Sequence, residues 1–199
     1  MKTKVIKKYI IFAIGTLIFG FGISLSNKSL LGGNPMSVLV SGITNILPFS
    51  FGTCNLIVGI IQIIVGYICD KKTVTFATIF GTICGSYAID FADLFIKDTN
   101  VLTIKIVYMI LGIILYCLGL ALQQVPNCGY SNLDCFIFGL AKVFKIDKYH
   151  IIRWIVDIAF LIIGYLLGGV VGIGTVLLFI VSGILIELFV NVFRKMISF

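Results

Sequence analysis

Charged side chains are rare in the long apolar segments of this chain, and four of them could do chemistry. Arg153 and Asp157 stand four residues apart in one apolar run, where they can pair on one helix face. Asp90 lies deep in an earlier run, and Asp134 lies in a polar break between two runs. A charge within a bilayer costs at least about 2.5–3.5 kcal/mol, so an unpaired carboxylate there indicates cation binding or proton transfer. Two alternatives stay open: a structural ion pair between Arg153 and Asp157, and a packing role for Asp90.

The break that contains Asp134, Gly129–Asp134, has an earlier counterpart at Gly32–Ser37. In the first break Asn34 is a favourable N-cap, followed by proline at the first helical position. In the second, Ser-x-x-Asp has the form of a capping box, so Asp134 either caps a helix or serves as a cation ligand at its start. Asn34 carries no charge and leaves its helix start open to an anionic group. The candidate substrate- or ion-binding residues are Asn34, Ser37, Asn55, Asp90, Asp134, Arg153 and Asp157.

The composition predicts an integral membrane protein. Hydrophobic residues make up 60% of the chain and charged residues 12%, against about half and about a quarter in soluble domains. The net charge of +7 does not indicate nucleic-acid binding, because no basic patch is interleaved with exposed aromatic residues. The six cysteines form no C-x-x-C pair, and the single histidine, His150, has no partners at ligand spacing. We therefore expect no metal and no cofactor, and no local set of residues indicates an enzyme.

Six apolar runs approach the ~20 residues that a membrane-spanning helix needs, and they predict an all-α, polytopic fold in one membrane domain, residues 1–199. The predicted spans are 9–26, 52–69, 73–96, 101–121, 151–167 and 171–193. The first run is longer than the apolar core of a signal peptide, so we expect it to be retained. Short helices are expected at 36–47 and 132–145, after the two breaks. They are too short to span, and each is either interfacial or re-entrant.

The distribution of basic residues predicts the orientation. If the N-terminus is cytoplasmic, six spans return the C-terminus to the same side. Twelve of the 15 basic residues then lie on the cytoplasmic side, and only Lys28, Lys97 and Lys105 lie outside. The positive-inside rule therefore favours two cytoplasmic termini. In that orientation Asp93 lies near the outer end of its span, where we expect it to be solvated.

The two halves of the chain match each other. At a spacing of 97 residues, Gly22, Gly32, Ser37 and Gly42 align with Gly119, Gly129, Asp134 and Gly139. Each half then reads as a span, a break, a short helix, and two further spans, over about 9–96 and 101–193. Three spans per half is an odd number, so the second half enters the membrane from the opposite side. This predicts an inverted-topology repeat, an architecture common among secondary transporters.

Several motifs carry a family resemblance over roughly residues 15–190. The first half has Gly-x-Asn-Pro-x-x-x-Leu and then Phe-Gly-Thr-x-Asn55. The second has Gly129-x-x-x-x-Asp134, Arg153-x-x-x-Asp157 and Gly-Tyr-Leu-Leu-Gly-Gly-x-x-Gly-Ile-Gly-Thr175. These resemble the YczE/YyaS/YitT-type bacterial membrane proteins. The family pattern often has an acidic residue in place of Ser37, arginine in place of Asn132, and glutamate in place of Asp157.

This resemblance implies a bacterial inner-membrane protein. The repeats favour a small-solute transporter or permease, with protons or cations coupled through Asp157, Asp134 or Asp90. Two other functions stay open: a substrate-binding membrane subunit of a multi-component importer, and a membrane factor for assembly or regulation. The expected partners are the lipid bilayer and an unknown small solute. A homodimer or an unidentified membrane partner is also open, and no nucleic acid is expected.

Overall fold

The computed structural model describes residues 2–146 and 148–197. Met1, Asp147, Ser198 and Phe199 of the predicted 1–199 membrane domain lie outside the described residues. The described part is all helical and contains no strand. Its helices are α1 (Lys2–Lys28), α2 (Pro35–Thr44), α3 (Phe51–Cys69), α4 (Phe76–Asp93), α5 (Leu102–Gln124), α6 (Asn132–Phe144), α7 (Tyr149–Leu166) and α8 (Ile173–Met196).

Every apolar run and both short segments form a helix close to its expected bounds. α1 begins earlier than predicted, because its lysine-rich start continues the helix toward the N-terminus. α2 begins where Asn34 caps it: the side chain accepts a hydrogen bond from Ser37 N at 2.8 Å, and proline follows the cap. α6 begins in the same way, with Ser131 Oγ accepting from Asp134 N at 3.1 Å. The polar breaks thus stop one helix and start the next.

Five of the described helices, α1, α3, α5, α7 and α8, are long and apolar enough to cross a membrane. α4 is not among them, although it occupies the third predicted span. Its 18 residues include Asp90 and Asp93, together with the buried polar residues Thr78, Thr82 and Ser86, which lower its hydropathy. The coarse prediction of a helical, multi-pass chain agrees with this architecture, and the sixth crossing stays a prediction.

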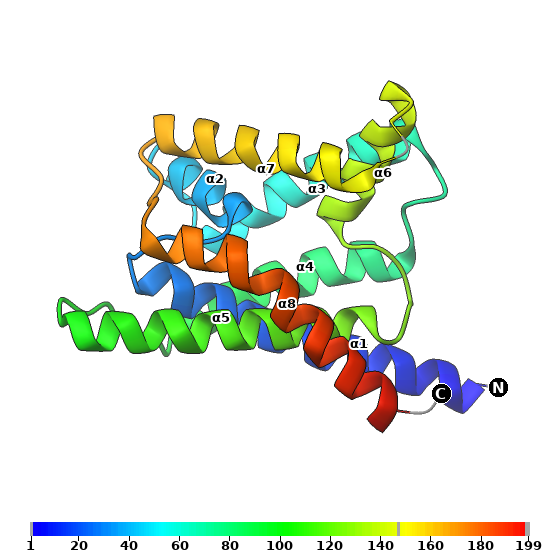
Figure 1. Ribbon diagram of the computed structural model, residues 1–199, viewed down its shortest axis with the longest axis horizontal. Coiled ribbons are helices and arrows are strands. Elements are labelled where there is room, and N and C mark those ends of the chain that lie inside the picture. Colours follow the sequence, from blue (N-terminus) through cyan, green and yellow to red (C-terminus); the bar gives the residue numbers. More distant parts are fainter. Residues whose placement is uncertain (1, 147, 198–199) are drawn as a thin grey trace.

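The helices lie roughly along the long axis of the molecule, with α1 and α5 packed against each other (Figure 1). α4 packs against α1 and also against α3, whereas α8 packs against α5. The short helix α2 packs on α7, and the short helix α6 packs on α3. Both ends of the chain lie at the same end of the molecule, which is also the end at which α6 lies (Figure 1). The six membrane crossings predicted from the sequence, an even number, would also place both termini on one side.

Glycines allow the α1–α5 backbones to approach closely. A Cβ added at Gly119 would lie 2.8 Å from Gly15 O, and one at Gly112 would lie 3.0 Å from Gly22 O. Gly22 itself lies against the backbone of Tyr116. Gly15, early in α1, contacts Gly119, late in α5, whereas Gly22, later in α1, contacts Gly112, earlier in α5. The two helices therefore run antiparallel. Small residues at such crossings let dispersion contacts form between backbones.

The packing of the short helices depends on glycine in the same manner. In the α2–α7 contact, a Cβ at Gly42 would lie 2.7 Å from Gly164 O. In the α6–α3 contact, a Cβ at Gly139 would lie 3.1 Å from Gly66 Cα. Each short helix therefore sits directly on a long helix from the other half of the chain.

Candidate functional site

Arg153 joins two carboxylates from two helices. Its Nε lies 3.1 Å from Asp157 Oδ2, one turn further along α7, and its Nη1 lies 3.3 Å from Asp134 Oδ1 in the first turn of α6. The structure thus forms the Arg153–Asp157 ion pair, one of the two alternatives open from the sequence. It also adds Asp134, so three of the seven candidate residues meet in one cluster.

Tyr149 completes the cluster. Its hydroxyl donates to Asp134 Oδ1 at 2.5 Å and accepts from Arg153 Nη1 at 3.1 Å. The Ser131 hydroxyl donates to the other carboxylate oxygen of Asp134 at 2.8 Å. Both oxygens of Asp134 are therefore engaged, and the arginine is held by three partners. We refer to Ser131, Asp134, Tyr149, Arg153 and Asp157 as the ionic cluster.

Local sequence places these groups. Tyr149, Arg153 and Asp157 recur every four residues and so share one face of α7. Ser131 is the N-cap of α6, as the capping pattern predicts. The Asp134 carboxylate, however, accepts from Ser131 Oγ, Tyr149 and Arg153 in the described hydrogen bonds, rather than closing a capping box on the backbone. Asp134 is thus part of a charge network as well as of a helix start.

The ionic cluster is largely shielded and carries an excess of negative charge. The Asp157 side chain is 10% exposed, that of Asp134 26% and that of Arg153 34%. Two carboxylates face one guanidinium, which leaves one negative charge when all three are ionised. Groups of this kind within a membrane protein pair with each other and mark ion or proton pathways. Because pairing does not cancel its charge, the cluster can hold one further monovalent cation or a proton.

The ionic cluster is connected to the other half of the chain through its neighbour Asn132. Asn132 Nδ2 donates to Gln62 Oε1 of α3 at 2.6 Å, and Gln62 Nε2 lies 3.4 Å from Met36 Sδ of α2. Gln62 is buried. A movement of the start of α6 would therefore displace side chains of α3 and α2 that are linked to it by these contacts.

Two candidate residues, Asn55 and Asp90, lie apart from the ionic cluster. Asn55 Nδ2 donates to Ser86 Oγ at 3.0 Å and so links α3 to α4. Asp90 accepts from Ser50 Oγ and from Gly52 N, both at 2.7 Å. Its carboxylate therefore sits at the N-terminus of α3, where the helix dipole favours negative charge. These contacts give both residues a role in joining helices.

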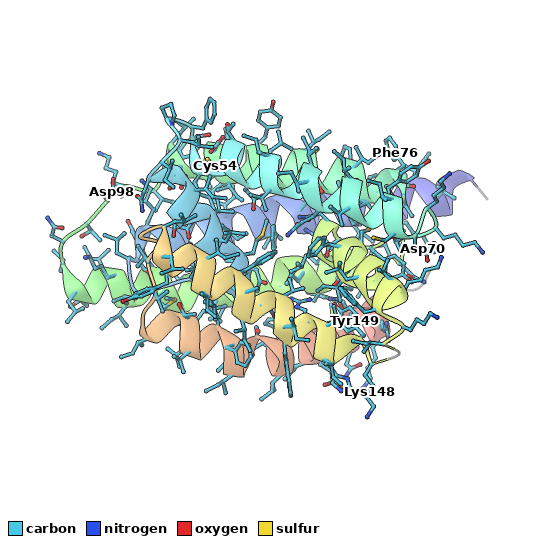
Figure 2. The ribbon with its side chains drawn as sticks, turned by 90° about the horizontal axis from the view of Figure 1, so that it is seen from above. Cys54, Asp70, Phe76, Asp98, Lys148 and Tyr149 are labelled. Atoms are coloured by element: carbon cyan, nitrogen blue, oxygen red, sulfur yellow. The ribbon has the colours of Figure 1, made fainter. Side chains whose placement is uncertain are left out.

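The remaining candidates, Asn34 and Ser37, lie beside a cavity of about 230 Å³. The cavity is walled by the end of α1, the start of α2 and the end of α4, and Ser37 lines it. Asp98 also lines it, and Figure 2 shows Asp98 at the opposite end of the molecule from Tyr149. The cavity and the ionic cluster are therefore separate sites at the two ends of the helices.

One sequence prediction near the cavity is wrong. Asp93 is half-buried rather than solvated, and it accepts a hydrogen bond from the Ser24 hydroxyl of α1. The reason is that α4 packs along α1, which places the last turn of α4 against a buried serine. Asp93 lines the cavity together with Lys28.

Three residues that line or form these sites are not predicted from the sequence: Tyr149, Lys28 and Asp93. Tyr149 had a usable signal, because it continues the four-residue spacing of Arg153 and Asp157. Lys28 and Asp93 had none, since they are distant in sequence and meet only through the packing of α1 on α4.

Comparison with known proteins gives a family and no activity. The model of a "Family of unknown function (DUF6198)" matches residues 6–191. A protein of Bacillus subtilis, "Uncharacterized protein YyaS", is 26% identical over 194 residues, which cover 94% of each chain. An "Uncharacterized protein" of Haemophilus influenzae is 26% identical over 187 residues, 94% of this chain and 84% of that one. No solved structure matches. The match to YyaS confirms the family resemblance seen in the motifs.

Proposed function

Since this chain belongs to the DUF6198 family of unknown function, its family brings no activity with it, and we propose from its geometry that it is a small-solute transporter. In this proposal the chain crosses the bacterial inner membrane six times, as two inverted repeats, with both termini in the cytoplasm. The ionic cluster binds the coupling proton or cation.

The observation that carries the proposal is the reciprocity of the helix contacts. At a spacing of 97 residues, Gly15 corresponds to Gly112 and Gly22 corresponds to Gly119. The contact of Gly15 with Gly119 therefore becomes the contact of Gly112 with Gly22, which is also present. Such mutual exchange is what a two-fold axis between α1 and α5 would produce.

The other helix contacts support the same relation. With α2 equivalent to α6, and α3 to α7, the α2–α7 contact exchanges with the α6–α3 contact. The residues agree, because Gly42 on Gly164 corresponds to Gly139 on Gly66 at spacings of 97 and 98. The α2–α7 pair and the α6–α3 pair are thus packed through glycines at equivalent positions of the two halves.

The relation between halves is broken most clearly at the contact of α3 with α4, and this difference supports alternating access. α4 packs against α3, whereas the equivalent helix α8 has no comparable contact with α7 within the described residues. In inverted-repeat transporters, rocking of one repeat against the other opens the site to alternate sides of the membrane. In this proposal the closed α3–α4 pair and the open α7–α8 pair exchange their roles during transport.

The ionic cluster is suited to sense that exchange. Its residues lie on α7 and at the start of α6, and Asp157 is its least exposed member. Movement of α7 toward α8 would change the surroundings of Asp157 and Arg153 together. Binding of a cation or proton to the excess carboxylate would then favour one conformation over the other.

Flux in liposomes tests the proposal. Purified full-length protein is reconstituted into liposomes that contain a pH-sensitive dye, and single metabolites are added from a panel of small polar solutes. We expect one class of solute to drive proton or cation movement in the wild-type protein. Asp157→Asn should reduce that movement to the level of protein-free liposomes while the protein stays folded.

Glu187→Gln is the matched control, because it removes one carboxylate from an exposed position on α8. It should leave flux unchanged. Wild-type flux in Asp157→Asn would remove the ionic cluster from the mechanism. Absence of flux for every solute, combined with co-purification of an ATPase, would instead support a substrate-binding subunit.

A further inference from the structure

The cavity at the start of α2 has the features of a binding site for a small solute. Its volume of about 230 Å³ is below the range of about 300–1,000 Å³ typical of pockets for drug-sized ligands. Its polar wall includes Ser26, Asn27, Ser37 and Ser41. We propose that this cavity binds a small aliphatic ammonium compound that also carries a hydroxyl group.

The charge of the wall favours a cation. The charged residues that line the cavity are Lys28, Asp93 and Asp98. Lys28 Nζ lies 3.0 Å from Asp98 Oδ1, so the one ammonium of the wall is already paired. The second carboxylate, Asp93, is half-buried, and among the described residues it accepts a hydrogen bond from the neutral hydroxyl of Ser24. With all three groups ionised the wall carries one excess negative charge, and walls of low dielectric strengthen its attraction for a cation.

The neutral groups of the wall favour a hydroxyl on the same ligand. Ser37 and Ser41 line the cavity with hydroxyl side chains, and Asn27 lines it with an amide side chain. A few polar groups of this kind orient a ligand in a pocket. An ammonium group offers donors only, whereas a ligand hydroxyl both donates and accepts and so can bond to hydroxyl and amide groups of the wall.

An anionic ligand fits less well, although the cavity lies at a helix start. The partial positive charge of the α2 N-terminus is already met by Asn34, whose side chain accepts from Ser37 N. Asp93 would repel a carboxylate or phosphate, and Lys28 would have to leave Asp98 to bind it. The excess carboxylate therefore decides the sign of the ligand charge.

This inference deepens the proposed function, because it names the substrate class and rests on the chain being a transporter. The ionic cluster at the other end of the molecule shows the same balance of two carboxylates and one basic group. A cationic solute would thus meet an acidic site at either end of its path. Binding at the cavity can nevertheless be measured without transport.

Calorimetry and thermal unfolding of the purified full-length chain test the inference with three matched probes. Ethanolamine supplies an ammonium and a hydroxyl, ethylene glycol replaces the ammonium by a second hydroxyl, and glycolate replaces it by a carboxylate. All samples have equal ionic strength, and sodium chloride alone is a fourth arm. We expect only ethanolamine to bind and to raise the melting temperature, since a ligand of the folded state stabilises it.

Variants locate the binding. Asp93→Asn should weaken ethanolamine binding by at least about tenfold, as expected when a charged hydrogen-bond partner is lost. Asp98→Asn provides a second test if Asp93→Asn does not fold, because Asp98 is 79% exposed and its loss should still weaken binding. Asp70→Asn, which removes a carboxylate at the far end of the molecule, is the control and should bind like the wild type (Figure 2).

Each other outcome overturns the inference. Stabilisation by glycolate or ethylene glycol instead of ethanolamine would assign the wrong ligand class, and an equal effect of sodium chloride would indicate an inorganic-cation site. Absence of binding by all probes would refute the inference even if another solute is transported. Binding of ethanolamine without any flux would support the cavity and refute transport, so the two failures are distinguishable.

Discussion

Gly22 of α1 lies directly against the backbone of Tyr116 in α5, so that no side chain fits between the two helices. We expect Gly22→Ala to destabilise the protein by about 1–3 kcal/mol, because the added methyl group forces the helices apart. The measurement is the apparent melting temperature in detergent. Gly183→Ala on α8 is the control, since an added Cβ there meets nothing within 4 Å. It should be neutral or stabilise by up to about 1 kcal/mol through helix propensity. Equal stability of Gly22→Ala and wild type would refute the close packing of α1 on α5.

Removal of Arg153 should leave Asp134 and Asp157 facing each other without their shared partner. We expect Arg153→Met to cost about 1–3 kcal/mol, less than the loss of a fully buried ion pair, because Arg153 is partly exposed. Adding Asp157→Leu to this variant should recover part of the loss. A double-mutant cycle in detergent measures the coupling, which we expect at about 0.5–3 kcal/mol. Additive effects of the two substitutions would show that the pair is not coupled.

The surface ion pair between α3 and α6 predicts a pH dependence. Lys142 Nζ lies 3.1 Å from Asp70 Oδ1, and this hydrogen bond, helped by the backbone N–H of Lys72, holds the pKa of Asp70 below its usual value of 3.8. A lowered folded-state pKa stabilises the fold above the unfolded pKa, and that contribution disappears as the pH falls through the lowered value. The melting temperature of Asp70→Asn should therefore be slightly below that of wild type at pH 5–7, and the difference should vanish in stronger acid. Lys142→Gln should show the same pattern, and a difference that grows in acid would contradict it.

The proposed orientation predicts the behaviour of reporter fusions. A green fluorescent protein fused after residue 199 should fluoresce, because this reporter matures in the cytoplasm. Alkaline phosphatase inserted in the connection between α4 and α5, residues 94–101, should be active, because that connection lies outside in the proposal. Inactive phosphatase combined with a dark C-terminal fusion would mean that α4 does not cross the membrane, because five spans from a cytoplasmic N-terminus leave residues 94–101 inside and the C-terminus outside.

The positions of the helices follow from the sequence because each depends on local features. The Asn-Pro and Ser-x-x-Asp motifs cap the N-termini of the two short helices, and each motif lies within a few residues of the helix start that it predicts. The pairing of Arg153 with Asp157 could also be predicted from the sequence, since side chains four residues apart on one helix lie on the same face. The predicted helix bounds therefore differ from the structure mainly at helix ends.

The composition of the sites could not be predicted in full, because it depends on contacts between helices. Asp134 joins Arg153 only because α6 folds back against α7. Asp90 lies deep in an apolar run of the sequence, which suggests a residue that faces a cavity. In the structure its carboxylate instead accepts a hydrogen bond at the start of α3, which begins 39 residues earlier. Periodicity within a helix does not report which neighbour a polar side chain will meet.

The antiparallel α1–α5 crossing has a consequence for how such a chain can be assembled. A half-length protein with Gly15 and Gly22 could form the same crossing with a second copy only if that copy were inserted upside down. Two separate halves would therefore need a dual-topology mixture in equal amounts. In the proposed inverted repeat, joining both halves through residues 94–101 supplies one copy of each orientation per molecule. In the proposed orientation, basic residues of both halves, such as Lys8 and Lys142, favour the cytoplasmic side of the membrane.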